Sequence, residues 1–169
     1  MGAATLISVE EYLSSSYEPD CDYVDGVLEE RNLGELSHGR LQLELGRYLG
    51  NRARQWNVLV SLEQRIRVAP RRVRIPDVCV FLRDRELEEV PTTPPLVCIE
   101  VLSPEDRWPR IEKRIADFLA MGVPWIWVFD PKRRRIFEYT KSGKREVLED
   151  LLEALPVSIR ISELMAELD

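Results

Sequence analysis

Cysteine and histidine are scarce in this sequence. Its 169 residues include one histidine and three cysteines, and the cysteines share no CxxC spacing. This scarcity argues against a zinc site built from cysteine and histidine ligands. Cys79 and Cys98 lie within apolar stretches, where a free cysteine behaves as a small hydrophobic side chain. We therefore expect structural thiols in a reducing, cytoplasmic compartment.

Long apolar runs are also missing. No stretch approaches the roughly 20 residues of a membrane-spanning helix, so we expect no membrane segment. The N-terminal segment lacks the basic start and long apolar core of a secretory signal. The chain begins with Met-Gly, but the sixth position carries no Ser or Thr, so the myristoylation pattern fails.

The sequence has no excess of positive charge. Its net charge of −6 argues against a protein that coats nucleic acid generally. It does not exclude an enzyme that approaches a phosphodiester locally, because acidic metal ligands themselves add negative charge. The basic residues cluster in 65–74, 107–114 and 132–135.

The first half of the chain predicts a hairpin, a helix and a strand. Asp25-Gly26 between two short extended runs is a strong hairpin signal. Ser37 is expected to cap an amphipathic helix that runs to about Trp56. From Val58 the apolar period changes to two, which predicts a strand with one solvated face. We see no repeats or linkers and expect one domain over residues 1–169.

The second half predicts a βαβ unit built on buried strands. Apolar runs at 74–81 and 96–102 indicate strands buried on both faces, with Pro76 at a strand start or in a bulge. A helix at 107–121 ends at Gly122 and leads to an apolar strand at 125–129. An edge hairpin over 136–148, a short strand at 157–161 and a final helix follow. The predicted fold class is α/β, a mixed β-sheet flanked by helices on both faces.

Two acids occupy positions where acids are costly. Asp77 begins one buried strand, and Glu100 lies inside the next. A buried carboxylate must be paired, hydrogen-bonded or bound to a metal. Strands consecutive in the chain can lie side by side, so the two acids could converge at one end of the sheet. Hard oxygen ligands of this kind suit Mg²⁺ or Mn²⁺. Each acid could instead be the partner of one of the many arginines.

Three segments, in their order along the chain, and two earlier landmarks resemble a known family. The segments are IPDV at 75–78, CIEVLSP at 98–104 and AMGVPWIWVFDP at 120–131, and the landmarks are Asp25-Gly26 and Ser37-His38. Over roughly residues 8–150 the sequence resembles the Uma-two family of bacterial endonucleases, which have a restriction-endonuclease-like core. The resemblance implies that Asp77 and Glu100 correspond to the metal-binding acids of the PD-(D/E)XK motif.

The lysine of that motif is not at its usual place, two residues after the glutamate, where this chain has Leu102. The resemblance implies that the basic group lies instead on the following helix, eight residues before the Gly-Val pair. In this chain that position is Arg114, with Lys113 beside it. At about 100° per residue, Arg114 lies at the edge of the buried stripe, whereas Lys113 points to solvent and could pair with Asp117. We therefore favour Arg114 over Lys113 at the site. Arginine can clamp phosphate but is a poor proton acceptor, which leaves weakened or lost activity open.

Two further residues are candidates for a supporting role. His38 should project onto the buried face of its helix, either as a packed or capping histidine or as a contact to a metal-binding acid or to the substrate. Glu63 is expected on the strand before Asp77, on the same face as Arg65. It could be a third acid, although a surface pair with arginine is the simpler interpretation.

The aromatic and basic residues after the helix have structural explanations. The apolar run at 125–129 contains Trp125 and Trp127, and we expect it to be core rather than a base-stacking surface. The basic run at 132–135 is expected to be a solvated turn, with a contact to the DNA backbone as the alternative.

The sequence thus predicts an Mg²⁺- or Mn²⁺-dependent endonuclease acting on DNA, a substrate implied by the resemblance alone. Two alternatives stay open: a catalytically inactive nucleic-acid-binding or regulatory module, and an assembly subunit on the same fold. A nuclease that cuts two strands could be a homodimer, and the sequence leaves this open.

Overall fold

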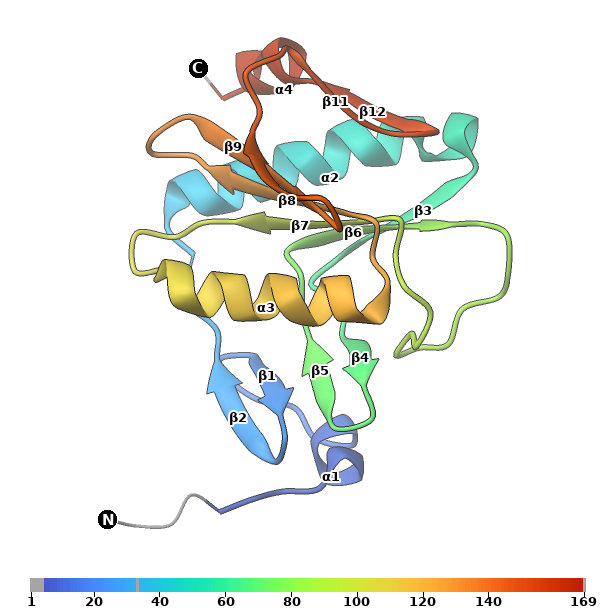
Figure 1. Cartoon of the computed structure of the whole chain (residues 1–169), viewed down its shortest axis with the longest axis vertical. Coiled ribbons are helices and arrows are strands. Elements are labelled where there is room, and N and C mark those ends of the chain that lie inside the picture. Colours follow the sequence, from blue (N-terminus) through green and yellow to red (C-terminus); the bar gives the residue numbers. More distant parts are fainter. Residues whose placement is uncertain (1–4, 33, 169) are drawn as a thin grey trace.

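A six-stranded mixed sheet lies at the centre of the computed structural model, which describes residues 5–32 and 34–168. The strand order is β10-β9-β8-β7-β6-β3. Helix α2 (Leu36–Trp56) covers one face of the sheet and α3 (Trp108–Met121) covers the other (Figure 1). The predicted fold class is confirmed. The six strands are β3 (Val58–Leu62), β6 (Val78–Leu82), β7 (Val97–Val101), β8 (Trp125–Asp130), β9 (Arg135–Thr140) and β10 (Gly143–Glu146).

Alternating side chains of the central strands fill two separate cores. On β6, Val78 and Val80 pack in the core that contains the apolar stripe of α2. Cys79 and Phe81 point the other way, into the core built on α3. Burial on both faces explains why these strands appear in the sequence as continuous apolar runs.

The predicted βαβ unit is present. Strands β7 and β8 are parallel and joined by α3, whereas the other neighbouring strands of this sheet pair antiparallel. Gly122 ends α3 with φ 106°, a left-handed conformation that glycine adopts without strain. Trp127 is fully buried, so the aromatic run belongs to the core as predicted.

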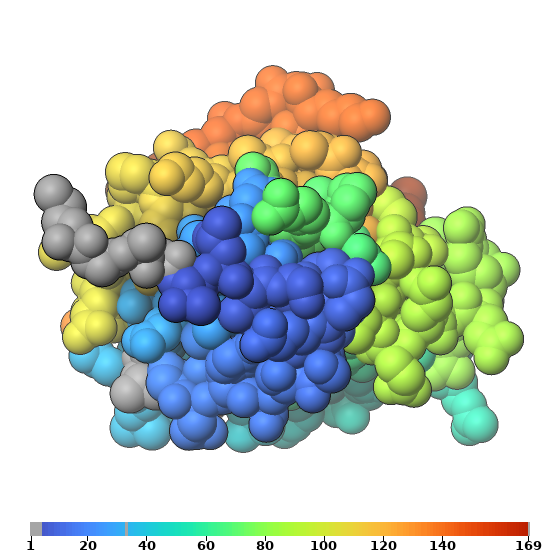
Figure 2. Space-filling view, turned by 90° about the horizontal axis from the view of Figure 1, so that it is seen from below, coloured from blue at the N-terminus to red at the C-terminus, as the bar shows by residue number. Residues whose placement is uncertain are grey.

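A second, four-stranded sheet lies beside α3 and was not predicted as a separate sheet. Its order is β2-β1-β5-β4. Together with α1 (Val9–Leu13) it forms the lower layer of Figure 1, and Figure 2 views this blue and green layer from below. Asp25 and Gly26 both have positive φ, 51° and 98°, in agreement with the predicted Asp-Gly hairpin. The strands are β1 (Cys21–Val24), β2 (Val27–Glu30), β4 (Ile66–Ala69) and β5 (Arg72–Arg74).

The chain ends in a β-ribbon and a short helix on the α2 side of the sheet. Strand β12 (Val157–Arg160) and helix α4 (Ile161–Ala166) agree with the prediction, whereas β11 (Leu151–Ala154) was not predicted. Leu152, Ile159 and Leu164 join the core that contains the α2 stripe. This segment therefore seals the side of the sheet opposite α3.

Three local predictions were wrong. Helix α2 begins at Leu36, and Glu35, not Ser37, is at its N-cap. The strand predicted from Val58 onwards ends at Leu62, because Glu63 adopts φ 48° and turns the chain towards the second sheet. The strand predicted over 74–81 is broken between β5 and β6, in the segment that contains Pro76, which has no N–H for a strand ladder.

The cysteines are buried free thiols, as predicted. Burial raises the pKa of Cys79 to about 12, so this thiol stays protonated and unreactive near neutral pH. Among the described residues, no helix has the length and apolar character needed to cross a membrane.

Candidate functional site

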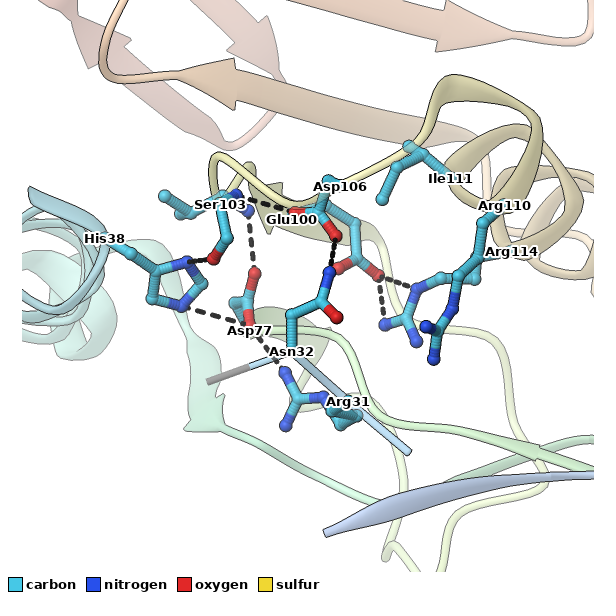
Figure 3. A pocket seen from close by; sticks show the side chains of 11 residues that line it. Arg31, Asn32, His38, Asp77, Glu100, Ser103, Asp106, Arg110, Ile111 and Arg114 are labelled. Carbon is cyan, nitrogen blue, oxygen red and sulfur yellow. Dashed lines mark hydrogen bonds and ion pairs between the residues drawn. The ribbon is translucent and has the colours of Figure 1, made fainter. Parts of the chain in front are cut away.

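Asp77 and Glu100 line the same small cavity at one end of the central sheet (Figure 3). Strands β6 and β7 are antiparallel neighbours with Val78 opposite Ile99, so Asp77, the residue just before β6, lies beside Glu100 on β7. Both acids are almost fully buried, at 2% and 4% exposure. The cavity measures about 40 Å³, which is room for an ion and a few waters.

Asp77 is held by a backbone amide and an arginine. Its Oδ2 accepts a hydrogen bond from the Val101 N–H at 2.7 Å, and its Oδ1 accepts one from Arg31 Nη2 at 2.5 Å. His38 Nε2 lies 3.6 Å from the same Oδ1. The carboxylate is thus fixed in orientation by β7, while Arg31 supplies the opposite charge.

Glu100 is held by Arg114 through one oxygen. Its Oε1 accepts hydrogen bonds from Arg114 Nη2 at 2.7 Å and Nε at 3.3 Å. Its Oε2 accepts no hydrogen bond from the described residues, and the side chain faces the cavity. Burial raises the pKa of Glu100 to about 7, against the opposing effect of Arg114. The second oxygen is therefore available to a ligand.

Arg114 is more deeply buried than an edge position implies. Besides Glu100, its guanidinium donates to Asp22 Oδ2 and to the Ile75 carbonyl. Four of the five N–H donors of the guanidinium are thereby used. In this arrangement Arg114 positions Glu100, with little capacity left to bind a phosphate.

Lys113 is exposed, as the helix geometry predicts. The predicted pair between Lys113 and Asp117 is absent. Asp117 instead accepts hydrogen bonds from Arg72 Nη1 and Arg74 Nε, each at 2.8 Å, because its side chain turns towards the second sheet.

The second sheet supplies a buried ionic network behind the site. Asp22, fully buried on β1, binds Arg114, Arg74 and the Ile75 N–H. Arg74 continues the network to Asp117 and Glu29. The sheet therefore anchors Arg114, and through it Glu100.

Several residues of the cavity and of the ionic network behind it were missed by sequence reasoning, and only one of them carried a usable signal. Asp22 lies between Cys21 and Tyr23 on a buried strand, which is the same signal that identified Glu100. Arg31 follows β2 in a polar segment that gives no indication of a buried partner. Two others, Asn32 and Asp106, are joined to each other at 2.7 Å across the mouth of the site (Figure 3).

His38 lies at the edge of the site with one side-chain partner beyond Asp77. Its Nδ1 is 3.3 Å from Ser103 Oγ, and its side chain is 12% exposed. Ser103 is in turn fixed by Asp106, which accepts from the Ser103 N–H at 2.6 Å. His38 thus links α2 to the segment after β7.

Glu63 lies outside the cavity wall, in the turn that follows β3. The predicted position beside Arg65 is wrong: Arg65 donates to the Ser15 carbonyl, and Glu63 is 3.9 Å from Arg31. Its side chain is 51% exposed. Glu63 contacts the site in two ways: its carboxylate lies near Arg31, and its backbone N–H donates to the Asp77 carbonyl oxygen at 3.2 Å.

Two carboxylates are the ligand set that this site offers a cation. The described residues contain no group of three or more His, Cys, Asp or Glu side chains able to hold a metal. Mg²⁺ is commonly bound by one or two carboxylates, with waters and substrate phosphates completing its octahedron. Asp77 and Glu100 fit that pattern and do not fit an all-protein cage.

Comparisons with known proteins agree on the fold. The crystal structure of a putative nuclease belonging to DUF820 from Anabaena variabilis ATCC 29413 is similar, with a TM-score of 0.84 and 23% sequence identity. The match covers 96% of this chain and 99% of that one. No curated protein matches the sequence.

A family model gives the most specific result. The model of Uma2, described as "Putative restriction endonuclease", matches residues 9–167. This range includes both acids, the arginine network and the segments that carry the resemblance in the sequence. The chain therefore belongs to the Uma2 family.

Proposed function

We propose that the protein is a divalent-cation-dependent nuclease that hydrolyses phosphodiester bonds in DNA, with Asp77 and Glu100 holding Mg²⁺ or Mn²⁺. The observation that carries the proposal is the convergence of these two buried carboxylates on one small cavity. Membership of the Uma2 family supports it.

The surrounding residues have distinct tasks in this proposal. When bound, the cation would lower the pKa of a water and polarise the phosphate. Asp77, fixed by the Val101 N–H, and Glu100, fixed by Arg114, present oxygens at set positions. The Arg31 guanidinium makes fewer hydrogen bonds than that of Arg114, because its one strong partner is Asp77. We assign Arg31 the task of offsetting negative charge on the reacting phosphate.

The pH dependence of cation binding tests the role of Glu100. Its pKa is raised from the ordinary 4.5 to about 7, so ionising it in the metal-free fold costs free energy, and this group destabilises the fold as pH rises through that range. A cation binds the ionised form and displaces the proton. We expect Mn²⁺ affinity, measured by calorimetry, to rise by up to about tenfold per pH unit from about pH 5 to 7 and to level off above about pH 8.

Glu100→Gln is the control for this titration, because the amide keeps the shape and has no proton to lose near neutral pH. The variant should bind Mn²⁺ weakly at every pH. A wild-type affinity that stays constant over the same range would argue against Glu100 as a ligand.

Arg31 provides a second test. Its positively charged guanidinium lies 2.5 Å from Asp77 Oδ1, so it repels a metal ion that binds the same carboxylate. We expect Arg31→Gln to strengthen Mn²⁺ binding by roughly tenfold, measured by calorimetry, and at the same time to slow DNA cleavage. Arg85→Gln, at an exposed arginine paired with Asp84, should change neither quantity. Unchanged Mn²⁺ affinity in Arg31→Gln would contradict the assigned position.

One observation favours a second function. Each acid already has an arginine partner, an arrangement that is stable without a cation. A non-catalytic nucleic-acid-binding module on this fold would retard DNA without cutting it. Incubation of supercoiled plasmid with Mg²⁺, Mn²⁺ or EDTA separates the two functions: the nuclease nicks DNA only with the cation, and the binding module leaves it intact.

A further inference from the structure

The cavity lined by Asp77 and Glu100, which we name the acid cavity, is too small for the nucleic-acid strand whose phosphate would react in it. At about 40 Å³ it has room for an ion and waters but not for a nucleotide. The nucleotides on either side of the reacting phosphate must therefore lie in adjoining hollows. Two such hollows share wall residues with the cavity, and they differ in charge.

The first hollow is acidic. It measures about 390 Å³ and shares Arg31, Asn32 and His38 with the acid cavity. Its other charged lining residues are Glu18, Asp20 and Glu63. This excess of negative charge repels a phosphodiester strand.

The second hollow, which we name the basic cleft, lies between the start of α3 and the turn joining β8 to β9. It measures about 360 Å³, within the range of ligand pockets, and shares Ser103, Asp106 and Ile111 with the acid cavity. Its basic lining residues are Arg107, Lys132, Arg133 and Arg135, against the acids Asp106 and Asp130. Among the lining residues positive charge is in excess, although the whole chain carries −6. Lys132 and Arg135 are paired with Glu35 and Glu146, which lie outside this lining.

The acids of the basic cleft are already satisfied within the fold. Asp106 accepts hydrogen bonds from the Ser103 N–H and from Asn32. Asp130 accepts from the Arg133 N–H at 3.0 Å and from its guanidinium at 3.1 Å. The negative charge facing an incoming strand is therefore partly neutralised.

Two arginines remain able to bind phosphate. The exposed Arg107 side chain makes no hydrogen bond or ion pair with any described residue. The Arg133 side chain is 72% exposed beyond its contact with Asp130. Trp108 and Phe137, which meet edge to face at 5.3 Å, add an apolar wall against which a sugar or base can pack.

We infer that the basic cleft binds the nucleic-acid strand next to the scissile phosphate, with Arg107 and Arg133 contacting its backbone. This inference rests on the proposed nuclease function, which places the reacting phosphate of the strand in the acid cavity. It assigns the basic run at 132–135 a contact that the sequence left as an alternative to a solvated turn. The acidic hollow takes no part in strand binding.

The test is oligonucleotide binding by the variant Arg107→Ala/Arg133→Ala. A short fluorescent single-stranded DNA is titrated in EDTA, so that cleavage plays no part. We expect the affinity to fall by about tenfold near 50 mM salt, and the slope of log K against log salt to decrease by about 1.4, since each lost phosphate contact on a single strand contributes about 0.7. Both side chains are exposed, and Asp130 keeps its hydrogen bond from the backbone N–H of residue 133, so the melting temperature should change little.

Arg54→Ala is the matched control. Arg54 is an exposed arginine in the last turn of α2, at the end remote from the start of α3 (Figure 1). This variant should bind like the wild type. Equal affinity and equal salt slope in the double variant and the wild type, or no binding by the wild type, would overturn the basic cleft.

Failure of the cleft and failure of the nuclease give different results. If the wild type cuts plasmid with Mn²⁺ and the double variant binds normally, the cleft is wrong and the nuclease stands. If the wild type binds through the two arginines but never cuts, the cleft stands and the proposed activity is wrong.

Discussion

Asp77→Asn is expected to lower cation-dependent DNA cleavage by about 1,000-fold or more. The change removes the negative charge that binds the cation but keeps an oxygen able to accept the Val101 N–H. Loss of a cation that supplies several kcal/mol of transition-state stabilisation costs a factor of ten for each ~1.4 kcal/mol. Initial rates of plasmid nicking with Mn²⁺ measure the effect.

Asp84→Asn serves as the matched control for this variant. Asp84 is an exposed aspartate that pairs with Arg85 in the loop after β6, outside the acid cavity. The Asp84→Asn variant should cut DNA at the wild-type rate. Both proteins should melt cooperatively, which separates loss of chemistry from loss of fold. Cleavage by Asp77→Asn at more than a tenth of the wild-type rate would exclude the proposed role of Asp77.

Arg114→Met is expected to lower the free energy of unfolding by about 3–5 kcal/mol, because it leaves the buried carboxylate of Glu100 without its arginine partner and removes one of the two arginine partners of Asp22. For a protein of this length the melting temperature should fall by roughly 6–20 °C. Methionine fills most of the volume of the arginine stem, so the loss comes mainly from the charge and its hydrogen bonds. Thermal and urea unfolding measure it.

Lys113→Met makes the same kind of change one residue away. Lys113 is exposed on α3, so its stability should change by no more than about 0.5 kcal/mol. The contrast between the two variants tests which residue of the pair belongs to the site. A melting temperature for Arg114→Met within about 2 °C of the wild type would show that the ionic network does not support the fold.

The sequence predicted the part of the fold that rests on two-sided burial. Strands β6, β7 and β8 are continuous apolar runs because both of their faces are covered by a helix, and such a run can be recognised in the sequence. The pairing of β6 with β7 followed from their order in the chain, and it places Asp77 beside Glu100. The short second sheet was not separable, because a strand of three or four residues carries too little periodicity.

The partners of the acids could not be predicted, because they depend on long-range packing. Arg31 and Asp77 are 46 positions apart in the chain, and Arg114 and Asp22 are 92 apart. Helix geometry placed Arg114 on the correct side of α3 but could not show that β1 supplies a buried carboxylate to it. The Asp22 position between two buried residues was the one readable signal.

The arginine partners also affect how strongly the site can bind a cation. Both acids are charge-balanced without a cation, so a cation must compete with Arg31 at Asp77 and with the proton at Glu100. Competition of this kind makes cation binding weaker than the carboxylates alone would give, and dependent on pH. Tight binding is not required, since substrate phosphate oxygens complete the coordination of Mg²⁺ in sites of this type.

The most direct measurement is anomalous diffraction from crystals of the protein soaked in Mn²⁺ near pH 8. The central claim requires one Mn²⁺ peak in the acid cavity, with an oxygen of Asp77 and Oε2 of Glu100 each at about 2.0–2.3 Å from it. A cavity without a peak, in which Arg31 and Arg114 keep their present hydrogen bonds to the two acids, would contradict it.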